Sequence, residues 1–123
     1  MSRPDLVAYG DEEIQARLET ELPGWYLEDG WLHRQYKTDG WPTTLMLVNA
    51  IGYLAEAAYH HPDLSVTWAK VWVKLKTHHA GGITDKDFQL ARQIEDTVLW
   101  RPAKGTALEG TPNRFVFAGK TGG

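Results

Sequence analysis

An Asp-Gly pair at positions 29 and 30 constrains the fold of this chain more than any other feature. It lies between two short runs, residues 25–28 and 31–37, which we interpret as strands. Because Asp-Gly readily adopts the backbone angles of a two-residue turn, this dipeptide between two such runs is the strongest short-range signal for a β-hairpin. A hairpin pairs its strands antiparallel, so we expect an antiparallel sheet.

A second pair of strands is predicted at residues 64–68 and 70–77. In the second of these runs, Val71, Val73 and Leu75 alternate with tryptophan and lysine. Alternation with a period of two is typical of a strand with one buried and one exposed face. The chain is therefore predicted to contribute four strands.

Two helices are predicted before the second strand pair. The first follows Asp11, which can cap it, and its apolar stripe ends at Pro23-Gly24. The second covers residues 43–59 after Pro42, a residue that suits the first turn of a helix. It is rich in leucine and alanine over a wide face, so we expect it to be the central buried helix.

A third helix is predicted to begin at Thr84, because Thr84-x-x-Asp87 has the pattern of a capping box. Short antiparallel strands and amphipathic helices predict an α+β fold: a four-stranded antiparallel sheet with three helices on one face. We expect residues 1–100 to form this domain. Residues 101–123 read as a C-terminal extension rich in glycine, proline and threonine, in which residues 114–117 are candidates for a further short strand.

Composition excludes several classes of protein. The chain has 123 residues and no cysteine, which excludes disulfides, thiolate metal sites and a cysteine nucleophile. Its net charge is −3 and its basic residues form no run, so we expect no nucleic-acid partner. No apolar stretch approaches the ~20 residues of a membrane span, and no apolar run opens the chain. We therefore expect a cytoplasmic protein with no membrane partner.

Two histidine pairs, His60-His61 and His78-His79, lie at the ends of predicted elements. One interpretation is a metal site, with Glu56 one helical turn before His60. Another is acid–base catalysis, since imidazole both gives and takes a proton near neutral pH. The third is structural, with each histidine satisfying nearby backbone groups. The residues alone leave the three open.

The stretch AEAAYHHPDLSVTWAKVWVKLKTHHAGGITDKD resembles the pterin-4a-carbinolamine dehydratase family. The resemblance fixes seven positions over 32 residues, which makes it specific: Glu56, His60, His61, Pro62, Trp68, His78 and Asp87. An early Gly-Trp segment also resembles the family and places Trp25 near the pocket.

The resemblance implies an enzyme that removes water from 4a-hydroxytetrahydropterin to give quinonoid dihydropterin, with no metal and no organic cofactor. It implies that His60 and His78 share the proton transfers and that His61 binds and polarises the substrate. Glu56 would hold the pterin or orient a histidine, and Trp25 would line the pocket. The family forms dimers and dimers of dimers, so a homodimer or homotetramer is expected.

Two residues of the family pattern also have a simpler, structural interpretation. Asp87 is explained by the capping box, and Trp68 is expected to be a core residue. The extension resembles the dehydratase-like branch encoded beside α-carboxysome RuBisCO genes, which implies RuBisCO as an alternative partner and carboxysome association as an alternative location. A third alternative, a transcription coactivator, has no specific support in the sequence.

Overall fold

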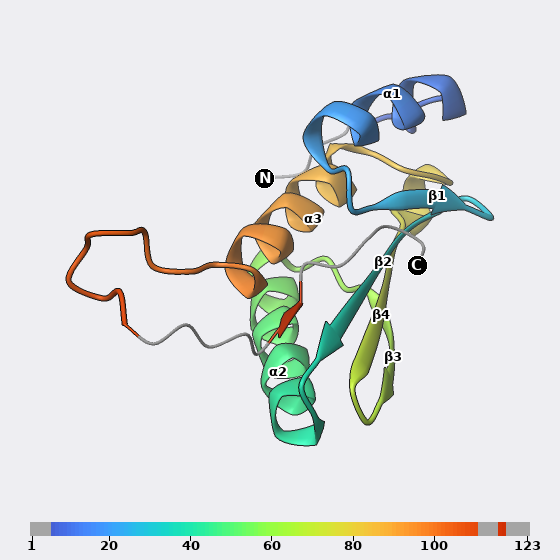
Figure 1. Ribbon diagram of the computed structural model, residues 1–123. Coiled ribbons are helices and arrows are strands. Elements are labelled where there is room, and N and C mark those ends of the chain that lie inside the picture. The colour runs from blue at the N-terminus through green and yellow to red at the C-terminus, as the bar shows by residue number, and fades with distance from the viewer. Residues whose placement is uncertain (1–5, 111–115, 118–123) are drawn as a thin grey trace.

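The computed structural model describes residues 6–110 and 116–117 of the chain. Three α-helices lie against one face of a twisted antiparallel sheet, and a loop after the last helix projects away from both layers (Figure 1). In chain order the elements are α1 (Asp11–Glu21), β1 (Tyr26–Glu28), β2 (Trp31–Thr38), α2 (Trp41–Ala58), β3 (Asp63–Thr67), β4 (Lys70–Leu75), the 3₁₀ helix η1 (His78–Ala80), α3 (Asp85–Val98) and β5 (Val116–Phe117).

The sheet has the order β1-β2-β4-β3, and β5 adds a fifth strand against the end of β2. The predicted hairpin is confirmed: β1 and β2 pair antiparallel around Asp29 and Gly30, whose φ angles are 53° and 81°. These left-handed angles are what the turn requires and what Asp-Gly accepts. The two hairpins meet in the middle, where β2 pairs with β4.

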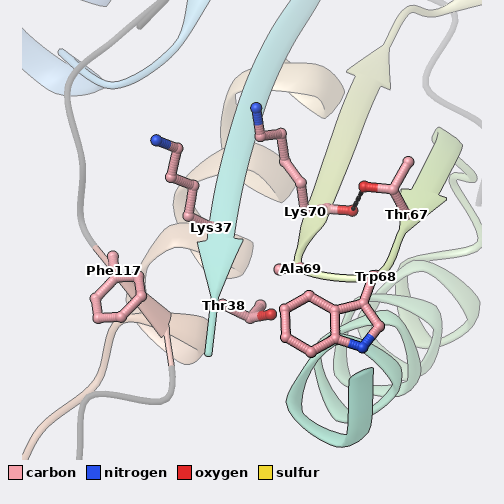
Figure 2. A pocket seen from close by; sticks show the side chains of 7 residues that line it. All are labelled: Lys37, Thr38, Thr67, Trp68, Ala69, Lys70 and Phe117. Carbon is pink, nitrogen blue, oxygen red and sulfur yellow. Dashed lines mark hydrogen bonds between the residues drawn. The ribbon is translucent and has the colours of Figure 1, made fainter. Parts of the chain in front are cut away.

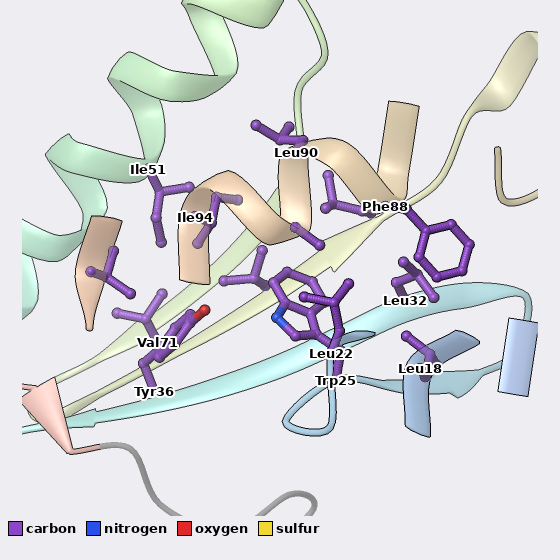
Figure 3. Packing of buried hydrophobic residues seen from close by; sticks show 14 of the residues in the cluster. Leu18, Leu22, Trp25, Leu32, Tyr36, Ile51, Val71, Phe88, Leu90 and Ile94 are labelled. Atoms are coloured by element: carbon purple, nitrogen blue, oxygen red, sulfur yellow. The ribbon is translucent and has the colours of Figure 1, made fainter. Parts of the chain in front are cut away.

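The core fills the space between the sheet and the helices. The even-numbered residues of β2 and the odd-numbered residues of β4 point inward and are buried, as the alternation predicts. Figure 3 shows α2 and α3 above the sheet, with Ile94 of α3 near Ile51 and Val71, and Phe88 near Leu18 and Leu32. This arrangement confirms the predicted α+β class with helices on one face.

Two local expectations are wrong. Asp11 does not cap α1: Gly10 holds the N-cap position without a side-chain bond, and Asp11 is the first helical residue. Trp68 is not a core residue, because it lies in the turn between β3 and β4 with 67% of its surface exposed. Of the candidate strand 114–117, Val116 and Phe117 form β5, and the first two residues lie outside the described ones.

A buried ion pair joins α3 to the sheet. Arg34 of β2, only 3% exposed, binds both carboxylate oxygens of Glu95 at 2.9 and 2.8 Å. The Tyr36 hydroxyl and the Trp25 indole also donate to this carboxylate, at 2.6 and 3.0 Å. Four donor groups on one carboxylate fix the position of α3 over β1 and β2.

Replacing Glu95 by alanine is expected to lower the free energy of unfolding by about 3 kcal/mol, because Arg34 stays buried without its carboxylate partner. Urea unfolding measures the change. The matched control is Asp96→Ala on the same helix, where the ion pair with Arg92 is exposed; that loss is expected to stay below about 1 kcal/mol. Equal losses in the two variants would contradict a dominant role for the buried pair.

The same carboxylate predicts a pH dependence. Burial alone would raise the pKa of Glu95, but hydrogen bonds from Arg34 and Tyr36 outweigh it and hold the pKa below 4.5. Because folding lowers this pKa, the stabilisation is present above the unfolded value and is lost as the pH falls through the folded value. The wild type is therefore expected to lose stability more steeply than Glu95→Ala below about pH 4.5.

Candidate active site

His60 is positioned by an abrupt end of α2. Tyr59 adopts the left-handed conformation, with φ 48° and ψ 47°, and closes the helix through its amide. The amide of His60 then donates to the carbonyl of Ala55 at 3.0 Å. A non-glycine residue in this conformation is uncommon and persists only where its surroundings hold it. This turn sets the direction in which His60 leaves the helix.

The carboxylate of Asp87 receives His60 and is completely buried. Its Oδ1 accepts a hydrogen bond from Nε2 of His60 at 2.7 Å. Its Oδ2 accepts from the Thr77 hydroxyl at 2.7 Å and from the Thr84 amide at 2.9 Å. The predicted capping box of α3 is therefore confirmed, and the capping carboxylate serves a second purpose as the partner of His60.

This geometry selects one protonation pattern for His60. A carboxylate only accepts hydrogen bonds, so Nε2 of His60 carries the hydrogen that Asp87 receives. Nδ1 has no partner among the residues that the structure describes. The side chain is 12% exposed. His60 is thus held at one nitrogen and open at the other, the arrangement that a general acid or base needs.

His60 also lies at the edge of an open groove of about 360 Å³ between α2 and α3. A hollow of this size is at the lower end of those that hold small ligands. Its walls combine aliphatic side chains with two amides and one ammonium group: Leu54, Ala57, Ala58, Lys86, Gln89, Leu90 and Gln93.

His61 points away from this groove and pairs with Glu56. Its Nε2 donates to Oε1 of Glu56 at 2.8 Å, and both side chains are exposed, by 53% and 76%. The ring of Tyr59 meets the His61 imidazole edge to face, with centroids 5.5 Å apart. Such an exposed pair contributes little to stability, but it fixes which nitrogen of His61 carries the hydrogen.

His78 begins η1, directly after Thr77. Its imidazole is exposed and packs edge to face on Trp31, with centroids 5.4 Å apart. Because Thr77 donates to the same carboxylate as His60, Asp87 ties together the two segments that carry His60 and His78. His79, which lies outside the family pattern, is also exposed.

The described residues contain no group of three or more histidine, aspartate or glutamate side chains that could hold a metal ion. Glu56 pairs with His61 instead of facing His60 from one turn earlier. Among the same residues, no helix is long and apolar enough to cross a membrane.

The structure shows contacts of Trp25 and Asp87 that their predicted roles did not include. Trp25 is 2% exposed, and its indole donates to Glu95, eight residues beyond Asp87 on α3 and so about 12 Å further along the helix. Trp25 therefore lies in the core, and its role in lining the substrate pocket stays a prediction. Asp87, interpreted as a helix cap alone, also holds His60. Thr77 was not predicted at all, since a threonine at a strand end carries no signal in the sequence.

Comparisons with known proteins agree on one family. The family model described as pterin 4 alpha carbinolamine dehydratase matches residues 8–97. A protein of Aquifex aeolicus, named "Putative pterin-4-alpha-carbinolamine dehydratase", is 48% identical over 88 residues, which cover 72% of this chain and 88% of that protein. A Roseiflexus castenholzii protein of the same name is 41% identical over 72% of this chain and 94% of its own length.

A solved structure supports the same assignment. The crystal structure of a transcriptional coactivator/pterin dehydratase from Brucella melitensis has a TM-score of 0.67 with this chain at 25% identity, covering 74% of this chain and 97% of that one. The match to the family model spans the three α-helices almost completely and includes Glu56, His60, His61, His78 and Asp87. The chain belongs to the pterin-4-alpha-carbinolamine dehydratase family.

Proposed function

We propose that this chain removes water from a 4a-hydroxytetrahydropterin to give a quinonoid dihydropterin. The observation that carries the proposal is the hydrogen bond between His60 and the buried carboxylate of Asp87, which also binds the segment leading to His78. Membership of the dehydratase family supports the reaction class.

The reaction is an exchange of protons around one bond that breaks. The C4a–O bond breaks and the hydroxyl leaves as water after it gains a proton. N5 forms a double bond to C4a and loses its own proton. The substrate is neither oxidised nor reduced, so the proposal requires one group that gives a proton and one that takes a proton. We propose that neither a metal ion nor an organic cofactor takes part.

His60 and His78 are the proposed acid and base. Asp87 holds Nε2 of His60 and stabilises the imidazolium that forms when Nδ1 takes a proton. A buried carboxylate behind an imidazole plays the same part in hydrolytic triads. His78, on the other segment held by Asp87, would exchange the second proton.

His61 is the proposed binding and polarising group, and Glu56 the residue that orients it. The bond between His61 Nε2 and Glu56 Oε1 supports the orienting role over a direct hold on the pterin. Trp25 stays the predicted substrate-binding residue of the early Gly-Trp segment, although its indole is buried and donates to Glu95.

The wild type is expected to accelerate dehydration of 4a-hydroxytetrahydropterin in a stopped-flow assay, and His60→Ala is expected to lower the rate by about 10²–10⁴-fold, the usual contribution of a general acid or base. His79→Ala is the matched control, since this neighbouring histidine is exposed and lies outside the family pattern; its rate is expected to stay close to that of the wild type. A wild-type rate no higher than the uncatalysed background would refute the proposal.

We also propose that the chain forms a homodimer or homotetramer. An exposed apolar stripe along α2 supports this, because single exposed apolar residues are ordinary but a contiguous patch marks an interface. Its members are Trp41, Leu45, Met46 and Tyr53, with exposed fractions of 44%, 42%, 57% and 74%.

If this stripe joins subunits, Met46→Glu combined with Tyr53→Glu should lower the mass measured by light scattering after gel filtration, because two carboxylates cannot be buried there without partners. Val7→Glu is the control, since Val7 is 70% exposed and lies outside α2. An unchanged oligomeric mass in the double variant would rule out α2 as the interface.

A second candidate function, assistance of RuBisCO assembly, is favoured by the extension. The family model ends at residue 97. Beyond it, residues 100–110 form a largely exposed loop, and β5 pairs with Lys37 and Thr38 of β2. Within this segment Trp100 and Leu108 are 59% and 72% exposed. We propose this loop as the contact with RuBisCO should the assembly function hold.

Co-expression with RuBisCO tests this candidate. Trp100→Ala combined with Leu108→Asp is expected to lower the yield of assembled RuBisCO, because the change removes exposed apolar surface and leaves the core intact. The dehydration rate of the same variant should be unchanged. Assembly that is identical with and without the wild-type chain would exclude the candidate.

A further inference from the structure

Lysines that are dispersed in the sequence lie together on the open face of the sheet. On the side of each strand opposite the core, Lys37 of β2 is exposed, and Lys70 and Lys74 of β4 are partly exposed. Lys76 continues the same alternation beyond β4. From Lys70 to Lys76 the row extends about 20 Å along one strand direction. No described element covers this face (Figure 1).

These four lysines keep their charge unneutralised. None of them lies within 4 Å of a carboxylate in the described part of the chain, whereas Arg17, Arg34 and Arg92 each form an ion pair. Two acidic residues on the edge strands share the face: Glu28 of β1 lies opposite Trp31, and Asp63 of β3 lies opposite Lys74 without forming an ion pair with it. A chain with a net charge of −3 therefore presents one locally cationic surface.

Two tryptophans lie among the lysines. The Lys74 ammonium lies 4.3 Å from the ring centroid of Trp31, and that of Lys76 lies 5.6 Å from the same centroid. The Lys70 ammonium lies 5.2 Å from the ring of Trp72. Aromatic rings and ammonium groups are thus interleaved on this face.

Where β2 ends beside the turn between β3 and β4, the face runs into a hollow of about 340 Å³. Figure 2 shows Phe117 and Trp68 on its two sides, with Lys37 and Lys70 projecting above. The rings of Phe117 and Trp68 are 40% and 67% exposed. The hollow therefore combines two aromatic side chains with two ammonium groups in its lining.

We propose that this face binds single-stranded nucleic acid. A linear row of unpaired lysines fits a phosphate backbone, and interleaved aromatic rings fit unstacked bases. An open antiparallel sheet with aromatic side chains is also the platform on which RNA-recognition modules stack bases. An acidic polypeptide would use the lysines but leave the aromatic rings without a partner. The expectation of no nucleic-acid partner rested on the absence of a basic run. Lysines at alternating positions of paired strands form a cationic face without any such run in the sequence.

Fluorescence titration of the full chain with short oligo(dT) and oligo(U) tests the proposal. Binding is expected to quench tryptophan emission and to weaken with salt, with a slope of log K against log salt of about −3, because each neutralised phosphate contributes roughly −0.7. Trp72→Leu is expected to weaken binding about 5- to 100-fold, the effect of losing one stacked base. Lys74→Gln, a surface change, should reduce the slope by about 0.7.

Matched controls are Trp100→Leu and Lys104→Gln, which remove one tryptophan and one lysine from the extension. Both are expected to bind like the wild type. His60→Ala should also bind normally, so failure of the dehydratase proposal would not affect this one. Three results would overturn it: no binding at low salt, equal losses in the controls, or polyglutamate binding as tightly as the oligonucleotides. The last would identify an acidic protein as the partner instead.

Discussion

The carboxylate of Asp87 is the point on which the candidate site depends. It is fully buried, and its two oxygens receive a histidine from the end of α2, a threonine from the end of β4 and the amide that opens α3. Burying a carboxylate without hydrogen-bond donors costs free energy, so the buried Asp87 requires these three donors. One anion therefore caps a helix, joins three elements and leaves one nitrogen of His60 open.

The two ends of α3 have different roles in the fold. At its beginning, Asp87 binds the partly buried His60 and, through Thr77, the segment that carries the exposed His78. Further along, Glu95 binds Arg34, Tyr36 and Trp25 inside the core and holds the helix on the sheet. A rigid anchor at one end allows precise placement of side chains at the other, which supports assigning chemistry to the first and stability to the second. The sheet face on the far side stays free for a different ligand.

Local patterns predicted much of this molecule. The Asp-Gly hairpin, the alternation of Val71 and Val73 and the capping box all depend on neighbours in sequence, and the structure bears them out. The contact between His60 and Asp87 was missed because it joins residues that are distant in the sequence. The bond from Asp87 to His60 spans 27 positions, so the cap concealed a partner for the histidine. Trp68 was expected in the core because the sequence placed it in a strand, whereas it occupies the turn between β3 and β4. The lysine face arises only when β2 and β4 pair.

The most direct test of the central claim is the tautomer of His60, measured by long-range ¹H–¹⁵N NMR of the ring nitrogens and assigned with His60→Ala. Neutral His60 is expected to carry its hydrogen on Nε2 and to leave Nδ1 unprotonated, and Asp87→Asn, which removes the acceptor charge, is expected to disturb this pattern. A neutral imidazole protonated at Nδ1 in the wild type, or a pattern unchanged by Asp87→Asn, would contradict the claim that this carboxylate sets His60 for proton transfer.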